Sequence, residues 1–596
     1  MREETIMAMQ FMCRFSGFIP ARLPWLIMLL YHFLLPSTDA FITTSINYTL
    51  PGDINLGGII PLHTYNEMTE KCGTLRSDAL KKLEAMVYAV QQINKNTTLL
   101  PNVTLGFEIY DTCSYDARTL RECLNFIPSA DNPGDGCTSS SEPRQKLPIV
   151  GVVGAQRSSS SVQAALLLGI YHIPQISYLS TSDELSDDIR FPYFLRTVGP
   201  DSYQIRAIID ILLHFDWKYV SFISSADTYG RNGRKVFTTL AAQNGICVGL
   251  SETVSLVDSR GRYDSLVKDL LNIQQEYSAT VVVLFIHLEM AQNIFSAATR
   301  MKAQRRFIWI GSDSWANYDE EAVIGNEEAA LGSFTVLPVS EISPEFNEYF
   351  RSLTPNTSNN PWLLEFLQYF TNCTDNCDQP GILDILDTDV STHETLVMDS
   401  VYAFAFALDN MRKDLCPNAI SGVCDEMKSA DGIVLRDYLL KTSFMSPNGR
   451  VSFMRNGDVA GRYTIKYLEK NVDENMYRFV KVGKWEEGTN FETIIHEDIT
   501  WYLQTNRSPQ SGNAVPKSIC SEPCGHGERI NVDIDNSCCW TCIRCYKHEV
   551  VTNNGTHCQS CIDEEMKLYA WPNKNSTECL PLTTNDNKCI NKSLKP

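Results

Sequence analysis

The sequence is short of positive charge. Lysine and arginine number 51 against 71 aspartates and glutamates, the formal net charge is −20, and no basic tract occurs anywhere. Because phosphate contacts need clustered lysine and arginine, this composition argues against a nucleic-acid-binding protein. Apolar residues make up 43% and charged residues 20% of the chain, which is typical of a globular protein and not of a disordered one.

Catalytic and metal-binding motifs are also missing. The chain contains no H-E-x-x-H motif, no nucleophile elbow and no glycine-rich phosphate loop. Its 10 histidines are scattered singly, and a lone histidine such as His393 is more often structural or solvated than functional. We therefore expect a protein without enzymatic activity, cofactor or bound metal.

Long apolar runs are rare. The run at residues 23–35 is shorter than the ~20 residues that span a bilayer, and it follows three arginines, Arg2, Arg14 and Arg22. Small residues lead from it to Ala40, so residues 1–40 are expected to be a signal peptide. No later run of 18 apolar residues occurs. Nine Asn-x-Ser/Thr sequons support export, at Asn47, Asn96, Asn102, Asn356, Asn372, Asn506, Asn554, Asn575 and Asn591.

Cysteine, by contrast, is abundant. Of 20 cysteines only Cys13 lies in the signal segment, and in an exported chain the others are interpreted first as disulfides. Ten of the 80 residues from Lys517 onward are cysteine, and helix patterning disappears there. This end is expected to be a separate disulfide-rich module, too small to be held together by a core alone.

The module also has a zinc-like spacing. Cys542-x2-Cys545 followed by Cys558-x2-Cys561 would suit a zinc ribbon inside a cell, but the oxidising export route and the surplus of cysteines favour disulfides. Upstream of the module, two pairs of cysteines lie close enough in sequence to form small disulfide loops, Cys373 with Cys377 and Cys416 with Cys424.

The stretch 147–187 organises the rest of the chain. The apolar run 149–153 predicts a strand buried on both faces, four serines at 158–161 lead into a helix, and a second strand at 174–179 ends in Ser180-Thr181-Ser182. In a parallel sheet both serine-rich loops lie at the carboxyl ends of strands, where open α/β sheets bind ligands. Hydroxyls and free backbone N–H groups suit a carboxylate or phosphate, although ordinary helix capping explains the serines as well.

Strand and helix patterns alternate from residue 41 to about 510. Apolar runs such as 279–286 alternate with amphipathic helices such as 75–94, which indicates βαβ units and parallel sheets. One sheet would be very large for about 470 residues, so two α/β lobes with a cleft between them are expected. The polar segment 338–389 lacks periodicity and is expected to be an insertion.

These features resemble the ectodomain of a class C G-protein-coupled receptor, most closely the metabotropic glutamate receptor group. The resemblance covers about residues 50–580, and its most specific element is a nine-cysteine block, CSEPC…SCCWTC…C…CQSC…WPN…C. Shorter matches are KCG at 71–73, LEAM at 83–86, FLR at 194–196, IGSDSWA at 310–316 and GRYTI at 461–465. It implies a signal peptide (1–40), a bilobed Venus flytrap of the periplasmic-binding-protein type I-like class (41–510), a cysteine-rich domain (516–581) and a tail (582–596).

By resemblance, the flytrap closes on an amino acid. Ser158 matches the serine that holds the α-carboxylate, with Thr181 beside it, and Asp201, Tyr229 and Asp313 match the residues that face the α-ammonium. Hydroxyls and helix N-terminal amides donate hydrogen bonds to a carboxylate, while carboxylates and an aromatic face suit an ammonium. A zwitterion would thus have donors on one lobe and acceptors partly on the other, so its contacts would favour the closed state.

The part of the pocket that meets a glutamate side chain departs from the family pattern. Lys82 keeps one cation, but the other two positions fall at Tyr318 and His393. Arg157 replaces a serine and Ser114 a tryptophan. Because two of the three cations are missing, the side-chain carboxylate of a glutamate ligand would have too few positively charged partners. The resemblance therefore implies an L-amino acid other than glutamate, as in the insect-type branch of the group, the mX receptors.

The resemblance also implies disulfides. Cys72 and Cys113 look like a first-lobe disulfide, and Cys416 and Cys424 like a second. Cys247 matches the second-lobe cysteine that pairs with the cysteine-rich stalk, here at Cys538, so that rotation of the lobe would move the stalk.

Cys137 matches the loop cysteine that bridges two receptor subunits, which implies a homodimer through the first lobe. A Cys123–Cys137 bond within one chain is the alternative, and Cys589 has no partner in the pattern.

The expected function is that of an amino-acid-sensing receptor ectodomain on the extracellular side of the plasma membrane. A G protein is then a partner only if the full product has a membrane domain. The alternative is a secreted amino-acid-binding protein or decoy without signalling, because the sequence ends in LPLTTNDNKCINKSLKP without a membrane helix. An exported enzyme on the same scaffold would lack a catalytic set.

Overall fold

The computed structural model describes most of the chain beyond the predicted signal segment. The described residues are 46–66, 69, 71–76, 78–127, 148–316, 319–374, 377–379, 381–385, 393–417, 422–471, 476–488, 499–505, 508–509, 514–533, 538–552, 554–563 and 568–581. Several predictions fall outside them: the signal peptide (1–40), the tail (582–596), Cys137, Tyr318, Asn506, Cys589 and Asn591.

The first lobe is built on a six-stranded sheet with the order β1-β5-β2-β6-β7-β8. Its strands are β1 (Asn47–Leu50), β2 (Ile54–Ile60), β5 (Leu105–Asp111), β6 (Ile149–Val153), β7 (Gln175–Ser177) and β8 (Phe194–Arg196). Only β1 at the edge is antiparallel to its neighbour. The predicted strand 149–153 is confirmed as β6, which is central because its apolar run can be buried on both faces.

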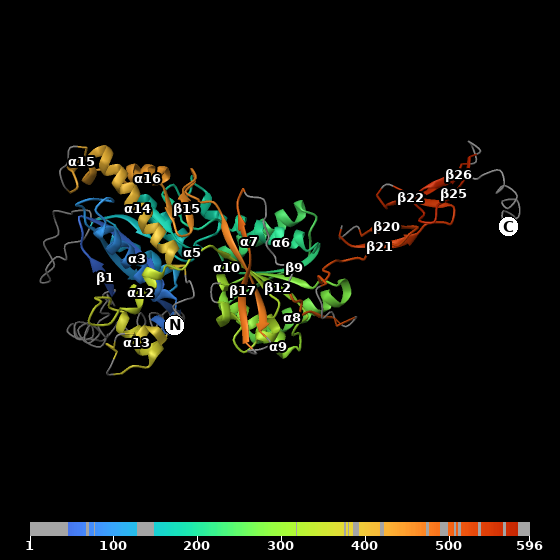
Figure 1. The fold of residues 1–596 in the computed structure, drawn as a ribbon, viewed down its shortest axis with the longest axis horizontal. Coiled ribbons are helices and arrows are strands. Elements are labelled where there is room, and N and C mark those ends of the chain that lie inside the picture. Colours follow the sequence, from blue (N-terminus) through green and yellow to red (C-terminus); the bar gives the residue numbers. More distant parts are fainter. Residues whose placement is uncertain are drawn as a thin grey trace, which may run out of the picture. The chain divides into compact units, whose positions relative to one another are not determined.

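Helices from distant parts of the chain cover this sheet. On one face, α3 (Ala79–Lys95) and α14 (Glu394–Leu415) share a single hydrophobic core and lie side by side (Figure 1). Gly151 in β6 has no side chain, which leaves room for the ring of Phe404 from α14. The opposite face packs against α4 (Asp116–Cys123) and α5 (Ser158–Ile170).

The second lobe contains a seven-stranded sheet with the order β10-β9-β11-β12-β13-β16-β17. The strands are β9 (Tyr219–Ser225), β10 (Cys247–Val254), β11 (Val281–Phe285), β12 (Ile308–Gly311), β13 (Phe334–Pro338), β16 (Arg462–Asn471) and β17 (Met476–Glu486). The first five run parallel, while β16 and β17 are antiparallel.

Strand β11 shows why the sheet is covered on both sides. Residues 281, 283 and 285 pack in the core that includes α6 (Asp201–His214) and α7 (Thr228–Gln243). Residues 282 and 284 pack in the core of α8 (Arg260–Tyr277) and α9 (Leu288–Arg300). Because successive strand residues point to opposite faces, a run of five apolar residues needs a helical layer on each side. The predicted architecture of two α/β lobes is confirmed.

Three segments connect the lobes, at residues 197–200, 339–343 and 453–461. A buried hydrogen-bond network based on Asp399 of α14 lies beside them. The Asp399 carboxylate accepts hydrogen bonds from Asn448 Nδ2 at 2.9 Å and Ser446 Oγ at 3.1 Å. Asn448 Oδ1 accepts from the Glu341 backbone N–H at 2.8 Å, and its carbonyl oxygen accepts from Arg462. The network therefore ties α14 to the connection that contains Glu341 and to Arg462, which directly follows the connection at 453–461.

The segment 338–389 differs from the prediction. Pro338 ends β13, and two helices follow, α12 (Pro344–Arg351) and α13 (Leu363–Thr371). Each is only eight or nine residues long and contributes two or three apolar side chains to the first-lobe core, such as Phe346 and Phe350. Such short apolar repeats, interrupted by proline and asparagine, give little periodic signal.

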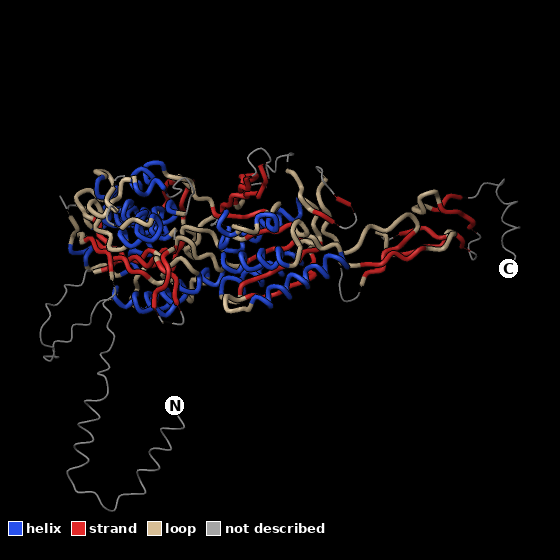
Figure 2. The backbone as a smooth tube through the Cα atoms, turned by 90° about the horizontal axis from the view of Figure 1, so that it is seen from below, coloured by secondary structure: helices blue, strands red, loops and turns tan. Residues whose placement is uncertain are grey.

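The C-terminal module consists, in its described part, of loops, two strand pairs and one three-stranded sheet, all of short strands (Figure 2). Four disulfides lie within it: Cys520–Cys539, Cys524–Cys542, Cys545–Cys558 and Cys561–Cys579. All four cysteines with zinc-ribbon spacing are therefore in disulfides. The structure also joins Cys72 with Cys113, Cys247 with Cys538, Cys373 with Cys377 and Cys416 with Cys424, whereas Cys123 is buried and bonded to no described cysteine.

Ser518 fastens the start of this module to the second-lobe sheet. Its carbonyl oxygen accepts hydrogen bonds from the N–H groups of Lys218 and Tyr219, both at 3.0 Å. Its hydroxyl accepts from Thr280 N at 3.1 Å and Val281 N at 3.2 Å, and donates to the Tyr219 carbonyl at 2.6 Å. The fully buried serine thus satisfies backbone groups at the amino ends of β9 and β11.

Six of the predicted glycosylation acceptors are exposed, Asn96, Asn102, Asn356, Asn372, Asn554 and Asn575. Asn47 is partly buried, and its amide donates to Glu108 at 2.9 Å. None of the helices in the described ranges is both long enough and apolar enough to cross a membrane.

Candidate functional site

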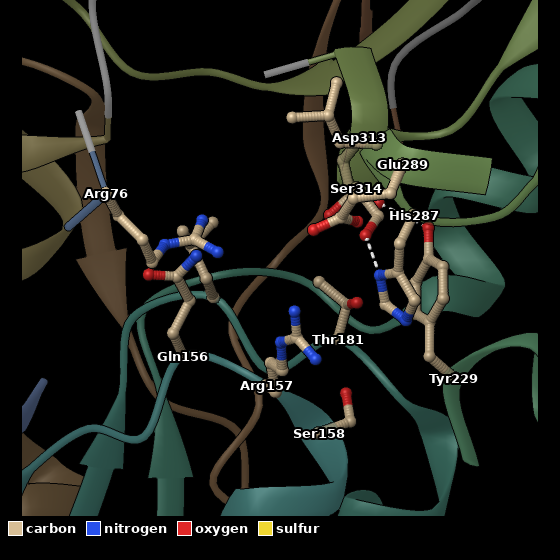
Figure 3. A pocket seen from close by; sticks show the side chains of 12 residues that line it. Arg76, Gln156, Arg157, Ser158, Thr181, Tyr229, His287, Glu289, Asp313 and Ser314 are labelled. Carbon is tan, nitrogen blue, oxygen red and sulfur yellow. Dashed lines mark hydrogen bonds between the residues drawn. The ribbon is translucent and has the colours of Figure 1, made fainter. Parts of the chain in front are cut away.

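A pocket lies at the carboxyl ends of the parallel strands of both lobes. The first lobe lines it with Arg76, Gln156, Arg157, Ser158, Leu179 and Thr181, and the second with Tyr229, His287, Leu288, Glu289, Asp313 and Ser314 (Figure 3). Most of these residues lie in the short segments that follow the carboxyl ends of β6, β7, β9, β11 and β12. The pocket thus occupies the position at which open α/β sheets bind ligands.

The four serines of the run 158–161 have different roles. Ser159 and Ser160 both donate to Asp116 Oδ1, at 3.0 and 2.6 Å, and so join α5 to α4. Ser161 is buried against Ser180 at 2.7 Å. Ser158 begins α5, and no serine side chain caps that helix, because its N-cap is Arg157 without a side-chain cap bond. The capping interpretation therefore does not explain the run.

Ser158 and Thr181 form the polar part of the first-lobe wall. Ser158 Oγ accepts a hydrogen bond from Ser182 N at 3.1 Å, which leaves the hydroxyl proton available to an acceptor in the pocket. The first backbone N–H groups of α5 are at the same place, since Ser158 is the first helical residue. This wall offers hydrogen-bond donors to an anion.

The second-lobe wall presents buried acids. Tyr229 OH donates to Asp313 Oδ1 at 2.7 Å, and Asp201 N donates to the Thr181 carbonyl at 2.6 Å, which brings Asp201 next to the pocket wall. Burial raises the pKa of Asp313, and burial together with the charges of Asp313 and Asp183 raises the pKa of Asp201 well above its usual range. A buried acidic cluster of this kind is complementary to a cation.

Two residues predicted for the distal end of the ligand do not line the pocket. Lys82 is buried in an ion pair with Asp78, and its ammonium also donates to Gln156 Oε1 at 3.3 Å. Although burial opposes it, the charges of Arg76 and Lys82 hold the pKa of Asp78 below its usual value. His393 is buried at the N-cap of α14 with φ of 70°. Among the predicted ligand residues, Ser158, Thr181, Tyr229 and Asp313 are brought together in the pocket wall.

The structure adds pocket residues that the sequence interpretation missed. Arg76 lies 3.3 Å from Asp78 Oδ1, whereas the Arg157 guanidinium and the Glu289 carboxylate, on opposite walls, make no hydrogen bond or ion pair with any described residue. Figure 3 shows Arg76, Gln156 and Arg157 grouped on one side of the pocket and Glu289 on the other. His287 and Glu289 directly follow the buried run of β11, so the rule that singled out the serine loops would also have found them.

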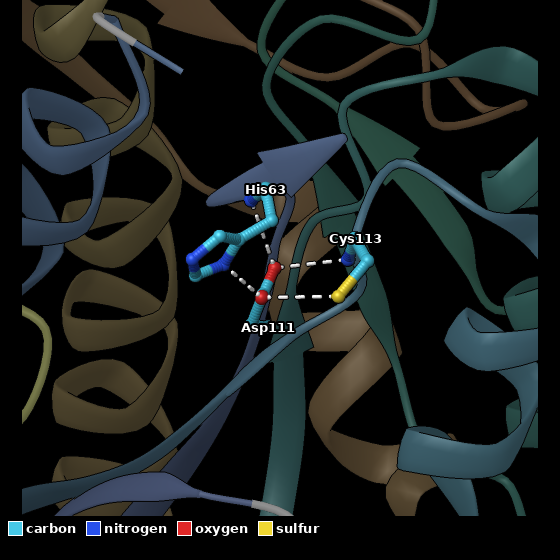
Figure 4. A group of neighbouring side chains, drawn as sticks. All are labelled: His63, Asp111 and Cys113. Carbon is cyan, nitrogen blue, oxygen red and sulfur yellow. Dashed lines mark hydrogen bonds and ion pairs between the residues drawn. The ribbon is translucent and has the colours of Figure 1, made fainter. Parts of the chain in front are cut away.

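A second polar cluster, away from the pocket, has the composition of a metal site. His63 Nδ1 lies 2.6 Å from Asp111 Oδ2 and its Nε2 lies 3.2 Å from Glu365 Oε1, while Cys113 lies beside Asp111 (Figure 4). Cys113 is bonded to Cys72 and has no thiolate to offer a metal. Of the group that includes Cys113, His63 and Asp111 remain as possible ligands, and His63 also links β3 (His63–Asn66) to Glu365 of α13.

Comparisons with known proteins match the two parts of the chain to two family models. The model described as "Receptor family ligand binding region" matches residues 81–471, and that described as "Nine Cysteines Domain of family 3 GPCR" matches residues 515–567. Both descriptions name domains of receptors.

Curated relatives agree with these models. Metabotropic glutamate receptor 8 of Mus musculus is 36% identical over 553 residues, and the Homo sapiens and Rattus norvegicus receptors of the same name are 35% and 36% identical over 551 residues. The alignments cover 89% of this chain, which spans 58% of the length of each relative. The chain belongs to the receptor ligand-binding-region family and, within it, to the metabotropic glutamate receptor group of class C G-protein-coupled receptors.

Proposed function

We propose that this chain is the extracellular region through which a metabotropic glutamate receptor-like receptor senses an L-amino acid. The observation that carries the proposal is the lining of one pocket by Ser158 and Thr181 from the first lobe and by Tyr229 and Asp313 from the second. An α-carboxylate would bind the first wall and an α-ammonium the second. Because a zwitterion makes both sets of contacts only when the lobes are close, its binding energy favours closure.

The proposed receptor has a flytrap at 41–510 and a cysteine-rich stalk at 516–581, on the extracellular side of the plasma membrane. A G protein is its partner if the full product has a membrane domain. The Cys247–Cys538 disulfide supports transmission, since it fixes the second lobe to the stalk.

The side chain of the proposed ligand is not a simple carboxylate. Arg76 is already paired with Asp78, and the carboxylate of Glu289 faces the same pocket as Arg157, neither of them with an ion pair to a described residue. A glutamate side chain would satisfy Arg157 but would leave Glu289 opposed by a like charge. A polar side chain with both donor and acceptor groups would satisfy both walls.

Titration of the purified glycoprotein with each of the twenty standard L-amino acids tests this proposal. At least one non-acidic amino acid should bind more tightly than glutamate and raise the melting temperature, because a ligand that binds only the folded protein stabilises it by RT ln(1 + [L]/Kd). Glutamate as the tightest binder would contradict the proposed side chain. A melting temperature unmoved by all twenty would contradict amino-acid sensing itself.

A homodimer through the first lobe is the second part of the proposal. Five large apolar side chains are 37% to 71% exposed on α4, on α5 and just after these helices: Leu120, Leu124, Leu166, Ile170 and Tyr171. Adjacent large apolar side chains at a monomer surface are typical of an interaction site. The predicted intersubunit cysteine, Cys137, lies outside the described residues, so this surface supports the dimer independently of it.

Ile170→Asp is expected to convert the dimer to monomer in a Cys137→Ser background, where no covalent bridge can hold the subunits. Burying an uncompensated carboxylate in an apolar interface should weaken association by more than about tenfold. Sedimentation equilibrium measures the change. Ile189→Asp is the matched control, because Ile189 is 91% exposed and belongs to neither α4 nor α5. If both variants dimerise like the parent, the interface lies elsewhere.

A further inference from the structure

A chain of hydrogen bonds runs along the second-lobe wall of the pocket. His287 is at its centre, with Nε2 2.5 Å from Asp227 Oδ2 and Nδ1 2.5 Å from Ser314 Oγ. The imidazole also lies 5.4 Å from the ring of Tyr229, centroid to centroid. Figure 3 shows His287 between Tyr229 and Ser314 at the edge of the pocket.

Asp, His and Ser in a row invite comparison with a hydrolytic triad. In a triad the serine contacts Nε2 and the carboxylate contacts Nδ1, whereas His287 has these two contacts reversed. The arrangement therefore differs from the one that activates a serine nucleophile, and the family is one of receptors. A structural role for the Asp227–His287–Ser314 hydrogen bonds agrees better with the two helices that they connect.

Each end is attached to an element that carries an ammonium-facing residue. Asp227 is the N-cap of α7, where its Oδ1 accepts from Gly230 N at 3.1 Å and from Ser225 Oγ at 2.6 Å, and Tyr229 is the second residue of that helix. At the other end, Ser314 directly follows Asp313 in α10 (Asp313–Ala316). His287 thus connects the helix that presents Tyr229 to the one that presents Asp313.

The two ammonium-facing residues are also joined directly, because Tyr229 OH donates a hydrogen bond to Asp313 Oδ1 at 2.7 Å. A bound ammonium would compete with Tyr229 for this carboxylate oxygen of Asp313. The spacing of α7 and α10 would then depend on contacts outside the ligand site. The Asp227–His287–Ser314 chain is such a contact, because none of its hydrogen bonds uses a group that we assign to the ligand.

We infer that His287 is a positioning residue of the ammonium subsite, which holds α7 and α10 at the separation where Tyr229 and Asp313 can both engage an α-ammonium. The inference rests on the proposed function. It assigns no contact with the ligand side chain to His287, so removing the imidazole should weaken all amino acids that bind by a similar factor. The ranking of the amino acids should stay unchanged.

The test compares His287→Ala, His287→Gln and His287→Asn in the full chain, with calorimetric titration of the twenty standard L-amino acids. Glutamine can reach the position of Nε2 and keep the Asp227 contact, while asparagine can reach that of Nδ1 and keep the Ser314 contact. We expect His287→Ala to raise every measurable Kd about tenfold, and the two amide variants to raise it less. His172→Ala is the control, because the side chain of His172 is 44% exposed and pairs with Asp431, which does not line the pocket.

Two double-mutant cycles separate positioning from a general loss of structure. His287→Ala combined with Tyr229→Phe should lose less affinity than the sum of the single losses, since both act on the ammonium end. His287→Ala combined with Ser158→Ala should be additive, since Ser158 belongs to the carboxylate end. Additivity in the first cycle, or unchanged affinities in all His287 variants, would overturn the inference while leaving the proposed function intact. An unsubstituted protein that binds no amino acid would overturn both.

Discussion

Asp201→Asn is expected to weaken amino-acid binding about 10- to 100-fold, the equivalent of one charge-assisted hydrogen bond. Asp201 is fully buried beside the pocket, and burial, together with the charges of Asp313 and Asp183, raises the pKa of its carboxyl well above the usual range. A neighbouring ammonium lowers that pKa again, because it favours the ionised form. Binding should therefore release a proton, and affinity should rise with pH through the pKa of the free protein.

Calorimetric titration in two buffers with different ionisation enthalpies measures this proton release. The unsubstituted protein should show a binding enthalpy that depends on the buffer, and Asp201→Asn should lose most of that dependence together with the affinity. Asp216→Asn is the control, because Asp216 has a side chain that is 84% exposed. Equal proton release by Asp201→Asn and the parent would show that another group titrates.

Asp399→Asn is expected to stabilise the protein at about pH 8 and to have little effect at about pH 4. Burial raises the pKa of Asp399 from 3.8 to about 6, against the opposing effects of its hydrogen bonds to Asn448 and Ser446 and the charge of Arg462. The folded state thus holds the proton more tightly than the unfolded state. The stability that this provides is complete below about pH 4, declines as the pH rises, and is lost above about pH 6.

The expected gain at the higher pH approaches about 3 kcal/mol, since each pKa unit corresponds to about 1.4 kcal/mol. Asparagine keeps a carbonyl oxygen for Asn448 and Ser446 but carries no charge to bury. Melting temperatures of the two proteins between pH 4 and pH 8, read by circular dichroism, measure the difference. Asp425→Asn, at a side chain that is 97% exposed, should show no such pH dependence. A constant difference across the range would place the titration elsewhere.

The strands were the most predictable part of the fold. The continuous apolar runs at 149–153 and 281–285 are β6 and β11, because a strand buried on both faces has to be apolar at every position. Helices α12 and α13 were missed because each buries only two or three side chains and depends on a core assembled from distant elements. Local pattern carries little information about such helices.

The pocket was predictable in position but less so in composition. The serine loop at 158 and the hydroxyl at Thr181 lie where the carboxyl-end rule places a ligand. Lys82, in contrast, is four residues after Asp78, a spacing that pairs opposite charges on a helix, and this pairing keeps it out of the pocket wall. The same rule would have found Glu289, which follows β11, whereas Arg76 follows no strand of the parallel sheets and enters the wall through tertiary packing, which no local pattern records.

A disulfide and a set of hydrogen bonds both hold the stalk to the second lobe. One is covalent, through Cys247 and Cys538, and the other is the set of five hydrogen bonds in which Ser518 takes part at the amino ends of β9 and β11. Breaking the Ser518 hydrogen bonds would leave buried backbone groups at the ends of these strands without partners, which costs free energy. We therefore expect the joint to stay rigid when the disulfide alone is reduced, so that rotation of the second-lobe sheet would still move the stalk.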